Sequence, residues 1–246
     1  MILFPAVDLK DGKAVRLKQG KADGASVFYD SPLEAARHWQ SLGAEWLHLI
    51  DLDGAFSGKS GNGEAVRAIC SSLDIPVQLG GGIRSAESAD FWFDAGVERI
   101  IIGTMALEQP DVFSHICRRH PGRVGVSLDA VGNDLKSRGW VKDAGRTLDE
   151  VIPAMIDLGA SFIIYTDIER DGMHKEINLE MTEHVASLCT VPLIVAGGVS
   201  TMESITSLYP LSLRTSLDGV ISGRAIYEGT LDFAGAVRWL QSRRTE

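Results

Sequence analysis

Two similar segments indicate the architecture of this chain: Gly80-Gly81-Gly82-Ile83-Arg84-Ser85 and Gly197-Gly198-Val199-Ser200. Each follows a short apolar run, Ile75–Leu79 or Val191–Ala196, and precedes residues with helical spacing. This order is typical of a strand, a glycine turn and a helix. Glycines let a phosphate group approach backbone N–H groups, and the helix behind adds the positive end of its dipole. One glycine turn could simply end a strand, but two matched copies favour phosphate binding.

The composition indicates a globular protein. Of the 246 residues, 45% are hydrophobic and 23% are charged, and the length suits a single α/β barrel. The net charge of −9 argues against nucleic acid as a partner. No apolar run approaches the roughly 20 residues of a membrane span, and the first residues do not resemble a signal peptide. We therefore expect a cytoplasmic monomer that binds neither nucleic acid nor membrane.

Eight short apolar runs are predicted to be strands, and several lack alternation, which is typical of parallel strands covered on both faces. They are Ile2–Val7, Trp46–Ile50, Val77–Leu79, Arg99–Ile102, Val124–Leu128, Phe162–Tyr165, Leu193–Ala196 and Val220–Ser222. The segments between them have helical spacing. Three predicted helices begin with capping boxes, at Ser31–Glu34, Thr147–Glu150 and Ser200–Glu203. Eight such units without a linker predict one (β/α)₈ TIM barrel, with an open doubly wound sheet as the alternative.

The chain also repeats itself at about half its length. Asp8 corresponds to Asp129, Gly80 to Gly197, and Gly103-Thr104 to Gly223-Arg224, at offsets of 121, 117 and 120 (129 − 8, 197 − 80 and 223 − 103). Any barrel repeats strands and helices, but matched aspartates and glycines are not explained in that way. We predict a single domain, residues 1–246, made of two half-barrels of about residues 1–121 and 122–246 that arose by duplication.

Two aspartates are the candidate catalytic residues. Barrel enzymes carry their active sites at the carboxyl ends of the strands. Asp8 is predicted to end the first strand and Asp129 the fifth, which lies opposite in a ring of eight. Facing carboxylates suit a general base and a general acid, provided that one is ionised and the other protonated. Either aspartate alone could cap a loop, but matched positions favour catalysis.

Candidate phosphate-binding residues fall into two sets on opposite sides of the predicted mouth. The first set contains Gly81, Gly82, Arg84, Gly103 and Thr104, and the second contains Gly197, Gly198, Gly223 and Arg224. A substrate with a phosphate at each end would span the opening. The sequence has no cluster with metal-ligand spacing, no nucleophile elbow and no dinucleotide fingerprint. We therefore expect proton transfer on a bis-phosphorylated small molecule, without metal or cofactor.

Five further residues have two interpretations each. Thr166 and Asp167 are predicted to end the sixth strand, where they form hydrogen bonds with a substrate or shape a turn. Trp140, in a polar loop after the fifth strand, could stack on a planar heterocycle or pack against its own loop. Arg16, in the loop after the first strand, suits a phosphate or bulk solvent. For His48, a strand-interior histidine held by its neighbours is favoured over a catalytic base.

At these positions the chain resembles the phosphoribosylformimino-aminoimidazole-carboxamide ribotide isomerases of histidine biosynthesis. The matching segments share the family's motifs over essentially the whole chain. They are Phe4–Gly12, Val15–Leu17, Gln19-Gly20, His48–Ala55, Gly80–Arg84, Ile102–Thr104, Leu128-Asp129, Thr166–Ile168, Asp171-Gly172, Ala196–Val199 and Gly223–Ala225.

The resemblance implies a half-barrel duplication and an Amadori rearrangement of an aminoaldose that carries two ribose phosphates. It implies that Asp8 removes the C2′ proton and that Asp129 assists furanose opening as an acid. Thr166 and Asp167 resemble supporting polar residues, Trp140 resembles the aromatic that stacks on the aminoimidazole, and Gly172 belongs to the binding loop. One departure is Ser212–Ser216, a longer stretch that is expected to lie away from the site.

Three other functions are weighed against this one. The cyclase subunit of imidazole glycerol phosphate synthase is similar, but Pro5-Ala6-Val7 stands where that family typically has a cysteine-leucine pair. A bifunctional isomerase that also accepts phosphoribosylanthranilate stays open, since Arg138 occurs in both groups. A catalytically silent phosphosugar-binding barrel is disfavoured by the presence of Asp8 and Asp129.

Overall fold

The computed structural model describes residues 1–18, 21–58, 60–137, 142–173 and 176–244. Eight described strands form a closed parallel ring, in which β12 pairs back to β1. In ring order they are β1 (Ile2–Lys10), β4 (Leu47–Asp51), β5 (Val77–Gly80), β6 (Arg99–Ile102), β7 (Val124–Val131), β10 (Ile163–Asp167), β11 (Leu193–Ala196) and β12 (Leu217–Ser222). The predicted (β/α)₈ barrel is confirmed, and the open doubly wound sheet is excluded.

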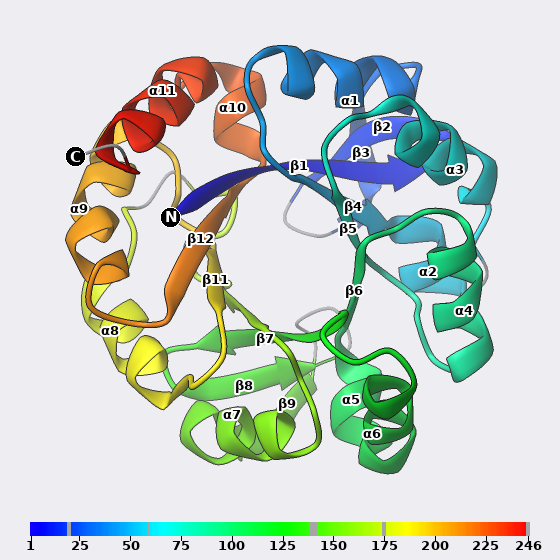
Figure 1. Ribbon diagram of the computed structural model, residues 1–246, viewed down its shortest axis with the longest axis vertical. Helices are drawn as coiled ribbons and strands as arrows, with labels where there is room; N and C mark the ends of the chain where they lie inside the picture. The colour runs from blue at the N-terminus through cyan, green and yellow to red at the C-terminus, as the bar shows by residue number, and fades with distance from the viewer. Residues whose placement is uncertain (19–20, 59, 138–141, 174–175, 245–246) are drawn as a thin grey trace.

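Helices surround the ring on its outside, as Figure 1 shows. The longer ones are α1 (Pro32–Ser41), α3 (Gly63–Ser72), α4 (Ala86–Asp94), α6 (Pro110–Arg119), α7 (Leu148–Asp157), α8 (Leu179–Leu188), α9 (Met202–Ser212) and α11 (Phe233–Arg244). Three short helices follow strands directly: α2 (Leu52–Ser57), α5 (Thr104–Glu108) and α10 (Arg224–Glu228). The last two occupy matching places, after the fourth and the eighth strand of the ring.

Two of the three predicted helix starts are confirmed. The Ser31 hydroxyl accepts the Glu34 N–H at 3.3 Å, and the Thr147 N–H donates to the Glu150 carboxylate at 3.1 Å. The third start was one residue early, because Thr201 and not Ser200 caps α9. The Ser204 hydroxyl donates to the Gly198 carbonyl at 3.2 Å, and this bond connects the first turn of α9 to the glycine turn.

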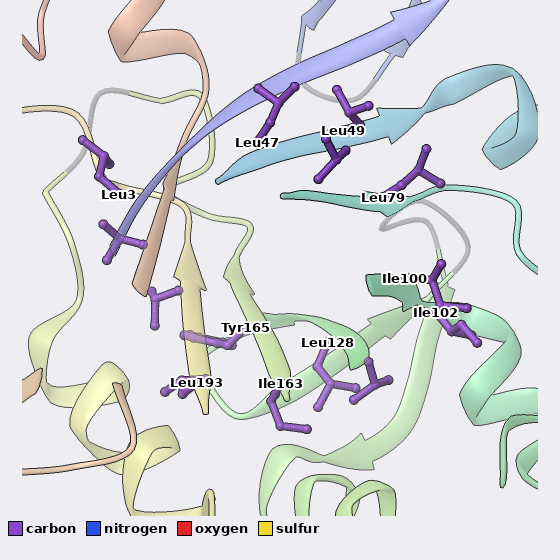
Figure 2. Close-up of a cluster of buried hydrophobic side chains, with 14 of the residues drawn as sticks. Leu3, Leu47, Leu49, Leu79, Ile100, Ile102, Leu128, Ile163, Tyr165 and Leu193 are labelled. Atoms are coloured by element: carbon purple, nitrogen blue, oxygen red, sulfur yellow. The ribbon is translucent and has the colours of Figure 1, made fainter. Parts of the chain in front are cut away.

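The strands separate two apolar layers. Side chains on their outer faces pack against the helices, and Figure 2 shows members of this cluster such as Leu47, Leu49 and Leu128 around the ring. The inner faces contribute a second cluster: Phe4, Ile101, Phe162, Ile164, Ile194 and Ile221. Because these side chains fill the barrel, a ligand has room only at the ends of the barrel.

Arg99 lies at the amino end of the interior. Its guanidinium carbon is 4.2 Å from the ring centroid of Trp46 and 4.3 Å from that of Phe162. Its Nε donates to Gln78 Oε1 at 2.8 Å, and the amide nitrogen of Gln78 contacts His48 Nδ1 at 2.8 Å. Desolvation lowers the pKa of Arg99 to about 10. A stacked guanidinium therefore occupies the end of the barrel opposite the candidate site.

The prediction that β1 ends at Asp8 and β7 at Asp129 was wrong, because both strands continue into hairpins. Asp8 pairs with Val15 of β2 (Lys13–Lys18), and Asp129 pairs with Lys136 of β8 (Asp134–Ser137). β3 (Lys21–Tyr29) and β9 (Lys142–Thr147) complete the two hairpins. β1 and β7 thus each have an antiparallel partner beyond the barrel rim. The division into duplicated halves near residues 121 and 122 stays a prediction.

Candidate active site at the carboxyl end of the barrel

Asp8, Asp129 and Thr166 face the barrel axis. Side chains alternate along a strand, and Asp8 shares its face of β1 with Phe4, which belongs to the inner cluster. Leu128 belongs to the outer cluster, so Asp129, the next residue of β7, points to the inner face. Thr166 shares the inner face of β10 with Ile164 and is the register neighbour of Asp129.

The two carboxylates belong to opposite sides of the barrel. β1 and β7 are separated by four steps around the ring of eight, and both residues lie beyond the inner apolar cluster, toward the carboxyl ends. Their side chains are partly exposed. This arrangement can hold a small molecule between two carboxyl groups, with a hydroxyl group beside one of them.

Asp167 lies one residue further along β10 and therefore on the outer face. It is 4% exposed, accepts the Glu169 N–H at 3.1 Å and pairs with the Arg170 guanidinium at 3.0 Å. Asp51, at the corresponding end of β4, is fully buried and caps α2 through the Gly54 N–H at 3.2 Å. Both aspartates organise loops, so the structure separates Asp167 from the three axis-facing residues.

The two glycine turns pack against these same aspartates. A Cβ atom at Gly81 would lie 2.2 Å from the Asp51 carbonyl oxygen, and one at Gly197 would lie 2.3 Å from the Asp167 carbonyl oxygen. Both glycines have positive φ, 108° and 85°. Gly82 and Gly198 follow with φ of 68° and 82°. Glycine is therefore required at both turns, by close approach as well as by conformation.

The two short helices begin at candidate phosphate-binding residues. Gly103 precedes α5, whose first residue is Thr104, and Gly223 precedes α10, whose first residue is Arg224. Neither glycine has positive φ, and a Cβ at Gly103 would meet no atom within 4 Å. The backbone at the start of α5 thus leaves open space beside Gly103, and the start of α10 occupies the matching place in the ring.

The candidate arginines contact the loops around the mouth. Arg84 donates to the Ala55 carbonyl at 3.1 Å. Arg224 donates to the Gly172 carbonyl and pairs with Glu228 at 2.6 Å, so two predicted site residues are in direct contact. Gly172 has φ of 65°, which suits the turn after β10. Arg16 was predicted to lie in a loop but lies in β2, opposite Ser26 of β3, because β1 continues into a hairpin. Trp140 lies outside the described residues.

His48 is excluded from the mouth by its partners. It is 5% exposed and its Nδ1 contacts the Gln78 amide nitrogen, which makes Nδ1 the acceptor. Desolvation, aided by the charge of Arg99, lowers the pKa of His48 to about 3. The histidine is therefore neutral and held in the barrel interior, as its position in the strand predicted.

The described part of the chain holds no group of three or more His, Cys, Asp or Glu residues that could bind a metal ion. Its described helices are all too short or too polar to span a membrane. What the mouth offers is a pair of opposed carboxyl groups, a neighbouring hydroxyl group and two glycine-lined helix starts. These groups suit proton transfer on an anionic ligand.

Comparison with known proteins identifies the family. A family model described as histidine biosynthesis protein matches residues 2–232. The chain belongs to this histidine biosynthesis family. A relative from Desulfovibrio desulfuricans is 59% identical over 244 residues, which cover 99% of this chain and 98% of the relative. A relative from Nitratidesulfovibrio vulgaris is 56% identical over 243 residues, covering 99% and 100%, and one from Rhodospirillum rubrum is 44% identical over 237 residues, covering 96% and 98%.

These members of the histidine biosynthesis family share one name. Each is a 1-(5-phosphoribosyl)-5-((5-phosphoribosylamino)methylideneamino) imidazole-4-carboxamide isomerase. The resemblance found in the sequence is thereby confirmed at the level of the family. Because the alignments cover nearly all of each chain, the similarity includes both hairpins and both glycine turns.

Proposed function

We propose that this chain is the histidine-biosynthesis isomerase that converts an aminoaldose with two ribose phosphates into the aminoketose. The observation that carries the proposal is the placement of Asp8 and Asp129 on opposite strands, both facing the axis beyond a packed interior. The shared name of the relatives supports the same reaction. The chemistry is intramolecular, since hydrogen moves between neighbouring carbons and no external oxidant or reductant is consumed.

In this proposal the two aspartates divide acid and base work. Asp129 acts as the acid that assists opening of the furanose ring, and Asp8 acts as the base that removes the C2′ proton. Loss of that proton gives an enaminol, which tautomerises to the aminoketose. Thr166, next to Asp129 in register, supports the acid with its hydroxyl. General acid–base groups of this kind each contribute about 10²–10⁴-fold to the rate.

The two phosphates bind on opposite sides of the mouth. One is held by Gly81, Gly82 and Arg84, together with Gly103 and Thr104 at the start of α5. The other is held at Gly197, Gly198 and the start of α10, with Gly223 and Arg224. Backbone N–H groups at helix starts favour dianions of this kind. In the same proposal Arg16 contacts a phosphate, Trp140 stacks on the heterocycle, and Asp167 and Gly172 shape the binding loop.

The proposal is tested by turnover of the aminoaldose with purified protein. Asp8→Asn and Asp129→Asn remove the proton-transfer groups with little change of shape, so we expect each to lower kcat at least 10²-fold while binding of the substrate stays near that of the wild type. Full turnover in either variant would refute the assigned roles. A wild-type chain that leaves the substrate unchanged would refute the function.

The same assay separates the alternatives. Phosphoribosylanthranilate tests a second substrate, and the aminoketose with ammonia tests cyclisation. We expect isomerisation of the aminoaldose and no cyclisation, in keeping with the name of the relatives. Activity on phosphoribosylanthranilate stays an open alternative, whereas a monomeric state, a cytoplasmic location and independence from metal and cofactor stay predictions.

A further inference from the structure

The first hairpin is fastened to the neighbouring loop by one buried side chain, that of Asn62. Asn62 lies just before α3 and is 1% exposed. Its Oδ1 accepts the Gly12 N–H at 3.0 Å, across 50 residues of sequence. Its amide nitrogen donates to Asp51 Oδ1 at 2.7 Å and to Asp53 Oδ2 at 2.9 Å. Both ends of the amide are therefore engaged, which also fixes its orientation.

The segment that Asn62 holds is the tight turn after Asp8. Asp11 and Gly12 have φ of 51° and 73°, as in a two-residue hairpin turn of the primed type. In addition to the Gly12 contact, the Asp11 N–H donates to Asp53 Oδ2 at 2.9 Å. Both outward N–H groups of the turn therefore donate to the segment after β4, that of Asp11 to Asp53 and that of Gly12 to Asn62.

Asn62 makes these contacts in place of an ordinary capping bond. It occupies the N-cap position of α3, yet its side chain makes no capping hydrogen bond there. Asn178, 116 positions later (178 − 62), occupies the N-cap position of α8 and does cap, accepting the Met181 N–H at 3.1 Å. An N-cap bond stabilises by about 1 kcal/mol. The first half of the barrel gives up this bond at α3 and uses the same residue type to hold the turn.

We propose that Asn62 is a positioning residue for Asp8, which it holds in place by fastening the β1–β2 turn to the loop after β4. Asp8 lies in the stretch of β1 that pairs with both β4 and β2, where it is opposite Ile50 and Val15. The turn that Asn62 holds begins three residues later, at Asp11. This role rests on the proposed function, in which Asp8 removes the C2′ proton.

The test compares Asn62→Ala with Asn178→Ala, the corresponding asparagine that only caps a helix. We expect Asn62→Ala to lower kcat at least 10-fold and to change KM less than 3-fold, because a misplaced base affects the transition state more than binding. Asn178→Ala should lose stability but keep kcat. Asp53→Ala removes the acceptor of the Asp11 N–H and one of the two carboxylate acceptors of the Asn62 amide nitrogen, but it leaves the Gly12 N–H bonded to Asn62. It should show a smaller loss of kcat and guards against misfolding of Asn62→Ala.

Hydrogen exchange of the Asp11 and Gly12 N–H groups adds a direct readout. We expect these groups to exchange faster in Asn62→Ala than in the wild type, and at the wild-type rate in Asn178→Ala. An unchanged kcat in folded Asn62→Ala would refute the positioning role, and so would a loss of kcat shared equally by Asn178→Ala. Wild-type protein that fails to convert the aminoaldose would refute the proposed function itself. The two failures are therefore distinguishable.

Discussion

Replacing Gly81 by alanine tests how tightly the first glycine turn is built. Gly81 has φ of 108°, and a Cβ there would lie 2.2 Å from the Asp51 carbonyl oxygen and 2.9 Å from the Asp51 backbone nitrogen. Positive φ costs a residue with a Cβ about 1–2 kcal/mol. Overlap with backbone atoms that must move adds about 1–3 kcal/mol. We expect Gly81→Ala to lower the free energy of unfolding by about 2–5 kcal/mol.

Gly122→Ala is the matched control. Gly122 also has positive φ, 78°, but a Cβ there would meet no atom within 4 Å. It should therefore cost only the conformational part, about 1–2 kcal/mol. The effect of alanine on the unfolded chain is common to both variants and cancels in the comparison. The difference of about 1–3 kcal/mol isolates the contact with Asp51.

Urea unfolding measures the two free energies, and steady-state kinetics measures the effect on binding. Because the turn must shift to admit the methyl group, KM for the aminoaldose should rise in Gly81→Ala and stay constant in Gly122→Ala. Gly197→Ala, whose Cβ would lie 2.3 Å from the Asp167 carbonyl oxygen, should behave as Gly81→Ala does. Equal stability losses in Gly81→Ala and Gly122→Ala would refute the reasoning.

Two further predictions concern the amino end of the barrel. Arg99→Met removes a guanidinium stacked on Trp46 and Phe162 and leaves Gln78 Oε1 without its donor. We expect a loss of about 1–3 kcal/mol in urea unfolding and an unchanged kcat, and a lost kcat would contradict the separation of the two ends. Burial lowers the pKa of His48 to about 3, so between about pH 3 and 6.5 the folded protein binds fewer protons than the unfolded chain. The free energy of unfolding should rise with pH across this window by up to ~1.4 kcal/mol per unit and level off above it. Urea unfolding of His48→Gln should show a flatter dependence of this free energy on pH. Equal pH dependence in the variant and the wild type would contradict a neutral His48.

The barrel itself could be predicted from the sequence because parallel strands buried on both faces leave short apolar runs. Seven of the eight predicted runs start at the first residue of the observed strand or within one residue of it, and the early part of β12 was missed because Asp218-Gly219 interrupts the run. The hairpins were missed although Asp11-Gly12 and Gly132-Asn133 are two-residue turn signals. The strands that flank these turns mix polar residues with buried apolar ones such as Ala14, Val15 and Leu135, and so they contain no continuous apolar run that would predict them.

The role of Asn62 could not be predicted in the same way. A residue just before a helix is expected to cap it, and only the spatial approach of a turn 50 residues earlier gives its amide other partners. A contact of this kind depends on the closed barrel, in which β1 and β4 are neighbours. Local sequence therefore predicted the element that Asn62 begins but not the element that it holds.

A difference of one position separates the aspartates that face a substrate from those that build the mouth. Asp8 and Asp129 continue the inner faces of β1 and β7, whereas Asp51 and Asp167 continue the outer faces of β4 and β10. Since successive side chains of a strand point to opposite faces, a shift of one residue moves a carboxylate from the axis to the helix layer. The inward pair meets the open end of the barrel, and the outward pair accepts N–H groups of the following loops and presents its carbonyl oxygens to the glycine turns. The same residue type, near the carboxyl ends of four ring strands, thus supplies both the proposed chemistry and the loops around it.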